Sequence, residues 1–243
     1  MRLAVLSDIH SNLVALDAVL DDLAAQPAVD ATWVLGDIVG YGPQPNEVVA
    51  RLQTMSARAV MGNHDGAAVG LVDTSWFNPA AAAAIGWTTS VLTPESRAFL
   101  ADLPPRRVEE DLTGVHGSPR DPIWEYIVSP AVAAANLDAF DTRFCLFGHT
   151  HHPTILAMED GTIREVAGIP GPVHTHHPGR GLVNPGSVGQ PRDGDPRSAY
   201  LILDTTAWTA EFRRVSYDIE ATQHLMREHD LQSWLAERLS YGR

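Results

Sequence analysis

Short apolar runs that end in glycine, aspartate or histidine alternate with helical patterns along the first part of the chain. Residues 3–7, 33–35 and 57–61 predict short buried strands, because brief apolar runs bounded by turn-forming residues are typical of strands covered on both faces. Segments 13–25 and 48–55 predict the helices between them. Strands that alternate with helices usually pair in parallel, so this region predicts an α/β arrangement.

The remaining pattern predicts helices in the middle of the chain and strands toward its end. Residues 76–103 are helical in character, with segments that begin at Pro79 and Pro94. A last amphipathic helix is expected over 219–239, with leucines on or near one face. Further strands are expected at 107–110, 112–115, 144–147, 154–158, 162–166, 181–184, 199–203 and 209–215. The whole chain therefore predicts a layered α/β protein.

Length and composition fit a globular chain with one large core. A chain of 243 residues lies within the range of a single domain, which we expect to span 1–243. No apolar run approaches the length of about 18 residues that a membrane helix needs. The apolar stretch at the start, residues 1–7, is too short for a signal peptide. We therefore expect a cytoplasmic protein that does not associate with membranes.

The charge and the residue types exclude several kinds of chemistry. The net charge of −13 repels nucleic acid, so an anionic substrate would need local positive charge, which bound metal ions can supply. All 17 basic residues are arginine, which excludes Schiff-base, pyridoxal and P-loop lysine chemistry. The single cysteine, Cys145, lies in an apolar run and is expected to be a buried small hydrophobe.

Metal-ligand residue types follow five of the predicted strands, and ligand sites in α/β sheets lie at the carboxyl ends of strands. Mixed oxygen and imidazole ligands suit borderline divalent ions, and two ions about 3.5–4 Å apart usually share a bridging carboxylate. We expect Asp8 and His10, spaced i, i+2 at an extended strand end, to point to the same side. The candidate metal ligands are Asp8, His10, Asp37, Asn63, His116, His149 and His151.

These blocks, in this order, resemble the five motifs of the calcineurin-like metallophosphoesterase superfamily. Asp8-Ile9-His10 resembles its D-x-H motif, Gly36-Asp37 its G-D motif, and Gly62-Asn63-His64-Asp65 its G-N-H-D motif. His116 corresponds to its single histidine, and Gly148-His149-Thr150-His151 to its G-H-x-H motif. The later Asn184-Pro185-Gly186-Ser187 is similar to a loop common in its small bacterial members.

The resemblance implies a four-layer α/β/β/α sandwich with two central mixed sheets. It implies a first metal held by Asp8, His10 and His151, a second held by Asn63, His116 and His149, and Asp37 bridging both. His64 would act near the leaving group, as an acid or as a transition-state stabiliser. Two divalent ions are expected, Mn²⁺ or Fe first, with Ni²⁺, Co²⁺ or Zn²⁺ also accepted. A hydroxide that bridges the metals would then attack small phosphodiesters or phosphomonoesters, with nucleotides among the candidate substrates.

Other residues are candidates for substrate contact, each with a structural alternative. Arg192 could clamp a phosphate with its guanidinium or form a salt bridge in a turn. Tyr41 is expected to line the site. Trp124 and Tyr126 could shape the pocket or stack on a base, and core packing is the favoured interpretation. The cluster His174, His176 and His177 is interpreted as a loop near the site mouth or a solvated loop, and His152 as a residue beside the ligands or an exposed one.

The sequence also departs from one branch of the family and leaves rival functions open. The Asp-Arg pair that follows the bridging aspartate in serine/threonine phosphatases is missing from 38–42. Protein phosphatase activity is therefore disfavoured, and an aspartate partner for His64 is not expected from that position. The alternatives are a protein-interaction scaffold with a vestigial metal site, a nuclease, and a mononuclear metallohydrolase. A homo-oligomer that pairs through the last helix is also allowed.

Overall fold

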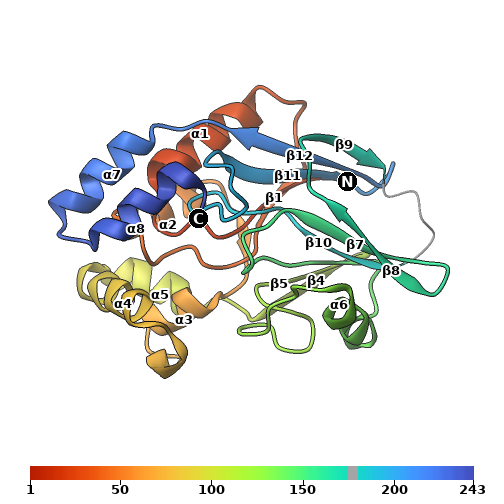
Figure 1. Cartoon of the computed structure of the whole chain (residues 1–243), viewed down its shortest axis with the longest axis horizontal. Coiled ribbons are helices and arrows are strands. Elements are labelled where there is room, and N and C mark those ends of the chain that lie inside the picture. The colour runs from red at the N-terminus through yellow and green to blue at the C-terminus, as the bar shows by residue number, and fades with distance from the viewer. Residues whose placement is uncertain (175–179) are drawn as a thin grey trace.

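Two mixed sheets stack face to face between outer layers of helices in the computed structural model, which describes residues 1–174 and 180–243 (Figure 1). The first sheet has the strand order β3 (Arg58–Ala59), β2 (Ala31–Val34), β1 (Arg2–Leu6), β11 (Ser198–Asp204), β12 (Thr209–Val215) and β9 (Gly171–His174). The second has the order β4 (Arg106–Glu109), β5 (Leu112–Val115), β6 (Phe144–Leu146), β10 (Gly181–Asn184), β7 (Thr154–Glu159) and β8 (Thr162–Ala167). The expected four-layer sandwich is confirmed.

Helices cover the outer faces of both sheets. Three helices pack against the first sheet, namely α1 (Leu13–Ala24), α2 (Pro45–Thr54) and α5 (Pro94–Ala101). The second sheet is covered by α6 (Pro130–Asn136). A separate apolar cluster joins α4 (Pro79–Val91) to α7 (Ile219–Glu228) and α8 (Ser233–Glu237). The short α3 (Asn63–Ala68) begins inside the third sequence motif. Among the described residues, no helix is long and apolar enough to cross a membrane.

The alternation of side chains along β1 shows how the sequence builds these layers. Leu3 and Val5 are fully buried in the core between the two sheets, and Ala4 and Leu6 are fully buried under the helices. A strand that is apolar at every position must be covered on both faces, because successive side chains point to opposite sides. Cys145 in β6 is likewise fully buried, beneath α6, as expected for a small hydrophobe.

The sheet topology brings the carboxyl ends of two sets of parallel strands together. In the first sheet, β1 pairs in parallel with β2, and β2 with β3. In the second, β5 and β10 both pair in parallel with β6. The loops after β1 and β2 remain joined beyond the strands, because Asp8 N donates to Gly36 O at 3.1 Å and His10 N to Asp37 O at 2.9 Å. The polar residues of five loops therefore meet at one edge of the sandwich.

The expectation of one continuous helix over 219–239 was wrong. The segment forms α7, α8 and a 3-10 turn at Arg238–Tyr241. Asp230 adopts a left-handed φ of 53°, and Leu231 N donates back to Met226 O at 3.0 Å. This turn ends the first helix and lets Met226, Leu231 and Leu235 pack in one cluster with residues of α4. The sequence pattern also did not predict α6 or β9. The strand expected at 57–61 is shorter than expected, because β3 spans only Arg58–Ala59.

Candidate metal centre

The motif residues sit in an unusual backbone conformation. Five of the candidate ligands have left-handed φ values, namely Asp8 (53°), His10 (50°), Asp37 (50°), His149 (65°) and His151 (60°). We expected Asp8 and His10 to point to one side of an extended strand end. This was wrong, because the backbone at both residues is left-handed and not extended. Their side chains nevertheless converge on one cluster of ligand atoms. Non-glycine residues in this region cost on the order of 1 kcal/mol or more each and cluster at functional sites.

Close backbone contacts explain the glycines beside these residues. A Cβ on Gly62 would lie 2.2 Å from Asp37 Oδ1, and a Cβ on Gly36 would lie 2.8 Å from Gly62 Cα. Gly36 itself has a φ of 82°. Only glycine lets the two loops approach this closely, so the sequence spacing and the geometry of the site are directly linked.

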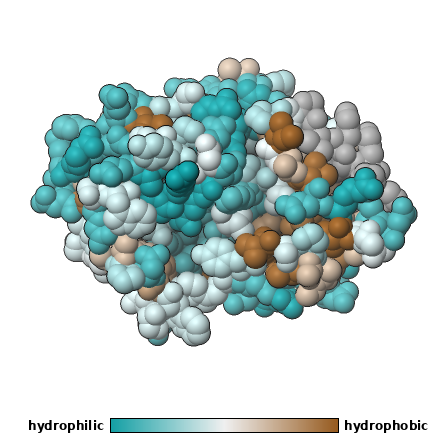
Figure 2. All heavy atoms as spheres, in the orientation of Figure 1, coloured by the Kyte–Doolittle hydropathy of each residue, from teal (hydrophilic) through white to brown (hydrophobic). Residues whose placement is uncertain are grey.

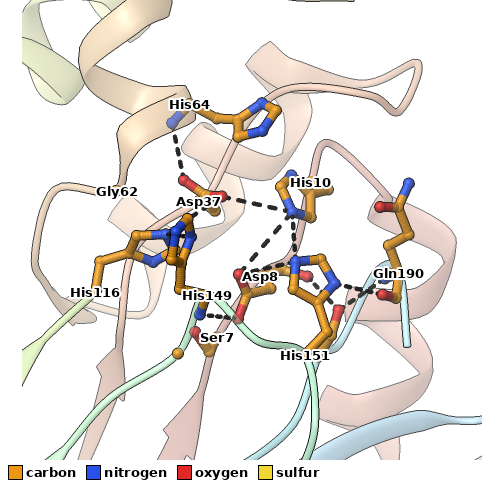
Figure 3. Close-up of polar contacts among 12 residues, drawn as sticks. Ser7, Asp8, His10, Asp37, Gly62, His64, His116, His149, His151 and Gln190 are labelled. Carbon is orange, nitrogen blue, oxygen red and sulfur yellow. Dashed lines mark hydrogen bonds and ion pairs between the residues drawn. The ribbon is translucent and has the colours of Figure 1, made fainter. Parts of the chain in front are cut away.

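One group of ligand atoms comes from Asp8, His10 and His151, whose donor atoms lie within 4.8 Å of one another (Figure 3). His151 Nε2 lies 3.2 Å from Asp8 Oδ1 and 3.2 Å from His10 Nε2. Asp8 holds the neighbouring loop as well, because its Oδ2 accepts a hydrogen bond from His149 N at 3.1 Å. All three side chains are almost completely buried.

A second group is formed by Asp37, His116 and His149, again with ligand atoms within 4.8 Å. His116 Nε2 lies 2.9 Å from His149 Nδ1 and 3.0 Å from Asn63 Oδ1. Asp37 lies between the two groups, with Oδ2 at 3.4 Å from His116 Nε2 and 3.6 Å from His10 Nε2. The structure thus brings together all seven residues that the sequence singled out as metal ligands.

Backbone carbonyls fix the orientation of three imidazoles. The Nδ1 atoms of His10, His116 and His151 lie 3.2, 2.8 and 2.5 Å from the carbonyl oxygens of Val39, Leu35 and Gln190. An Nδ1–H that donates to a carbonyl leaves Nε2 with its lone pair directed into the site. Burial, as the largest cause, lowers the pKa of all three rings, to about 4 for His151. The rings are therefore neutral at pH 7.

The resulting donor set fits divalent cations. The Nε2 lone pairs of His10 and His151 face each other at 3.2 Å. Asp8 Oδ1 is buried, and no hydrogen-bond partner for it is found in the described part of the chain. The side-chain amide of Asn63 can turn its nitrogen toward His116 Nε2 and the Asp37 carboxylate, or its oxygen toward a cation. Buried acceptors that converge without a donor are costly unless a cation lies among them. Burial and the charges of Asp65 and Asp8 also raise the pKa of Asp37 well above its usual range, which a cation would reverse.

His64 lies at the edge of this centre. Its backbone N donates to Asp37 Oδ1 at 2.9 Å, and its ring contacts the rings of Tyr41 and Phe77 at centroid distances of 4.5 and 4.9 Å. Its Nδ1 is buried, and no hydrogen-bond partner for it is found among the described residues. Burial lowers its pKa well below the usual value. A ligand atom of His64 also lies within 4.8 Å of those of His10 and Asp37, so proximity alone allows a ligand role.

The structure places the secondary candidates around the centre. Tyr41 is buried, with its ring 4.8 Å from that of His10, and the Arg192 guanidinium lies 5.8 Å from the Tyr41 ring. Arg192 donates to Gln190 Oε1 at 2.8 Å, whereas a carboxylate partner for it is not found among the described residues. His152 is exposed. The side chain of His174, together with His176 and His177, lies outside the described residues.

One contact of the site has no signal in the sequence, and Tyr126 does not lie in the core as the sequence predicted. The carbonyl of Gln190 orients His151, although nothing in the residue type indicates this. Tyr126 is not a core residue, because it is 47% exposed and its ring stacks on that of His149 at 3.7 Å. Trp124 is partly buried, 5.1 Å from the ring of Phe77. The contact of Gln190 with His151 and that of Tyr126 with His149 join loops that are far apart in the sequence. The pattern of residues along the chain does not predict such contacts.

The fold and the site define a four-layer α/β/β/α protein with a cluster of aspartate, asparagine and histidine ligands at the strand ends. Known proteins identify the class. The model of the calcineurin-like phosphoesterase superfamily domain matches residues 1–207, so the chain belongs to that superfamily. A crystal structure of a metallophosphoesterase from Sphaerobacter thermophilus is 44% identical, covers 100% of both chains and has a TM-score of 0.90.

Further similar proteins differ in how much of this chain they cover. An uncharacterized protein of Methanocaldococcus jannaschii is 38% identical over 99% of this chain and 98% of its own. The structure of a hypothetical protein from Pyrococcus horikoshii is 22% identical, with a TM-score of 0.82 over 100% of this chain and 98% of its own, and shows the shared fold. The symmetrical bis(5'-nucleosyl)-tetraphosphatase of Baumannia cicadellinicola is 37% identical over 62 residues, which span only 25% of this chain and 22% of its own length.

Proposed function

We propose that this phosphoesterase hydrolyses small phosphodiesters or phosphomonoesters with the help of two divalent cations. The observation that carries the proposal is the two adjacent buried clusters of ligand atoms, Asp8 with His10 and His151, and Asp37 with His116 and His149. Asp8, His10 and His151 would hold one ion, Asn63, His116 and His149 the other, and Asp37 would contact both. Mn²⁺ or Fe suits such mixed oxygen and nitrogen ligands, and Ni²⁺, Co²⁺ or Zn²⁺ would also be accepted. Such cations lower the pKa of water to near neutrality and neutralise phosphate charge.

The protein's own residues would position the phosphate and assist the leaving group. Arg192 is half-buried beside Tyr41, and no ion pair between it and a carboxylate is found in the described part of the chain. Its planar guanidinium suits a phosphate that enters from this side. Neutral His64 can donate one N–H to the leaving oxygen, and the packing of Tyr41 and Phe77 against its ring holds it in place. This arrangement needs no covalent enzyme intermediate.

The relatives support a nucleotide as one candidate substrate without selecting it. The similarity to symmetrical bis(5'-nucleosyl)-tetraphosphatases spans 25% of this chain. A match of this extent supports a shared phosphate chemistry, and specificity depends on the surfaces around the centre.

The test is hydrolysis of p-nitrophenyl phosphate and bis(p-nitrophenyl) phosphate by chelator-stripped protein, with Mn²⁺, Fe²⁺, Ni²⁺, Co²⁺ or Zn²⁺ added back. We expect turnover only with added metal, and the ratio of diester to monoester rates defines the preferred class. Two bound ions without turnover of any phosphoester would favour the alternative of a protein-interaction scaffold.

A further inference from the structure

A groove of about 670 Å³ lies beside the loop that carries His149 and His151. Its volume is within the range of about 300–1,000 Å³ that small-molecule sites occupy. Its lining comes from residues 126–129, from residues within the segments 150–156 and 165–170, and from Asp193, Asp195 and Arg214. The groove therefore lies between the loop before α6 and the strands β7 and β8, on the side of the molecule where hydrophobic atoms gather in Figure 2.

Tyr126 connects this groove to the candidate metal centre. Its ring stacks on His149 with a centroid distance of 3.7 Å and an interplanar angle of 25°, and the same residue lines the groove. Thr150, which lies between two candidate ligands in the sequence, lines the groove as well. The groove and the candidate metal centre are therefore adjacent, with Tyr126 in contact with both.

Large apolar side chains are exposed in the lining of the groove, beside exposed polar residues such as His152 and Glu165. Tyr126, Val128 and Ile169 are 47%, 72% and 70% exposed, and they are three of the nine large hydrophobic side chains that are exposed among the described residues. Ile127 and Leu156 are buried and also contribute to the lining. Exposed apolar side chains gathered at one concave surface mark a binding site, because each is costly to leave in water.

The charges of the groove oppose a second phosphate group. Three carboxylates belong to its lining, those of Glu165, Asp193 and Asp195. The one arginine of the described lining, Arg214, is 5% exposed and forms an ion pair with Asp193. No guanidinium of the described lining is therefore available to a polyphosphate chain that runs in this direction.

We propose that the groove binds an uncharged aromatic or apolar group that is esterified to the phosphate, so that the substrate is a phosphoester with one such group and not a polyphosphate. The inference rests on the proposed function, because the phosphate is placed at the candidate metal centre. Tyr126 would contact the inner part of the group, and Val128 and Ile169 its outer part.

The experiment compares the binding of phenylphosphonate and methylphosphonate to the Mn²⁺-loaded protein by calorimetry. The two ligands share the same phosphonate head group and differ mainly in the ring, so turnover is not needed for the comparison. We expect phenylphosphonate to bind about tenfold more tightly, the order that burial of much of one ring provides. In Ile169→Asp and Val128→Asp, the preference should fall to about threefold or less. Val108→Asp is the matched control, since Val108 is 56% exposed on β4 at the opposite edge of the same sheet.

The outcomes separate this proposal from the proposed function. Equal affinity for the two phosphonates, or a preference that Ile169→Asp leaves intact, overturns the groove proposal while metal-dependent phosphoester turnover stands. A preference for the phenyl group that Ile169→Asp removes, in a protein that hydrolyses no phosphoester with any metal, supports the groove and contradicts the proposed activity.

Discussion

Single side chains in the candidate centre are held by the backbone more than by one another. The carbonyls of Val39 and Leu35 accept from the rings of His10 and His116, and the N–H groups of His64 and His149 donate to buried carboxylates. Each ligand is thereby oriented before any ion arrives, which lowers the cost of assembling the site. A substitution at one ligand should therefore act on metal binding or on chemistry and leave the fold largely intact.

The role of His64 can be separated from that of the ligands by His64→Ala. We expect this variant to keep both ions and to lose turnover by a factor of about 10²–10⁴, the usual contribution of a proton donor. Metal content by atomic emission and kcat with bis(p-nitrophenyl) phosphate are the two measurements. His224→Ala, which changes a histidine on α7 whose side chain is 69% exposed, is the control. A loss of one ion that parallels the loss of activity would show that His64 is a ligand.

Asp37 is expected to contact both ions, so Asp37→Asn should weaken both. The amide keeps the size of the side chain and can still accept the hydrogen bond from His64 N, but it removes the charge that two cations share. We expect the metal stoichiometry measured by calorimetry to fall below one per chain at concentrations that saturate the native protein. A variant that still binds two ions with native affinity would refute the bridging position.

At the scale of elements, the loop between β5 and α6 is anchored through Glu125, the residue before Tyr126. Ser118 Oγ donates to Glu125 Oε2 at 2.5 Å and Asn136 Nδ2 at 2.7 Å, and Arg120 forms an ion pair with the same carboxylate. The bond from Arg120 is the largest of the causes that lower the pKa of Glu125 from 4.5 to about 2. One carboxylate thus ties the start of the loop to the end of α6 and presents Tyr126 to His149.

The lowered pKa of Glu125 determines how the effect of Glu125→Gln on the free energy of unfolding should change with pH. A carboxyl with a lower pKa in the folded state contributes stability above its unfolded value near 4.5 and loses it as the pH falls toward 2. The variant should be less stable than the native protein by about 1–3 kcal/mol at pH 7, with the difference shrinking below pH 4.5. Urea unfolding at pH 7, 5 and 3.5 measures this difference. A difference that does not change with pH would show that the loss comes from packing alone.

The elements also show what the sequence could and could not provide. The strand ends that carry Asp8, Asp37 and His116 were predictable, because short apolar runs that stop at polar or glycine residues leave few alternatives. The left-handed backbone at His149 was not predictable, because nothing in the residue type indicates it; there His149 N donates to Asp8 Oδ2, on a loop distant in the sequence. The break after α7 depends on a single turn at Asp230, which interrupts an otherwise helical pattern. Local periodicity predicts elements well, and it predicts the contacts between loops poorly.

For the whole molecule, the candidate centre is a junction between the two sheets. The loops after β1, β2 and β3 of the first sheet supply Asp8, Asp37 and Asn63, whereas those after β5 and β6 of the second supply His116 and the 149–151 pair. The centre therefore exists only while the two sheets are packed together. Ions bound there would be absent from the unfolded chain, so their binding energy adds to the stability of the entire sandwich.

Metal removal should accordingly lower the melting temperature of the entire protein in one transition. At a free Mn²⁺ concentration about 100 times the dissociation constant, one site adds about 2.7 kcal/mol, which corresponds to a rise of about 5–10 °C for a chain of this size. Calorimetry of chelator-treated protein with and without Mn²⁺ measures the shift. Because the net charge of −13 can also attract cations to the surface, Asp37→Asn is the control. An equal rise in that variant would place the stabilising ions at surface carboxylates, whereas a rise confined to the native protein would place them between the sheets.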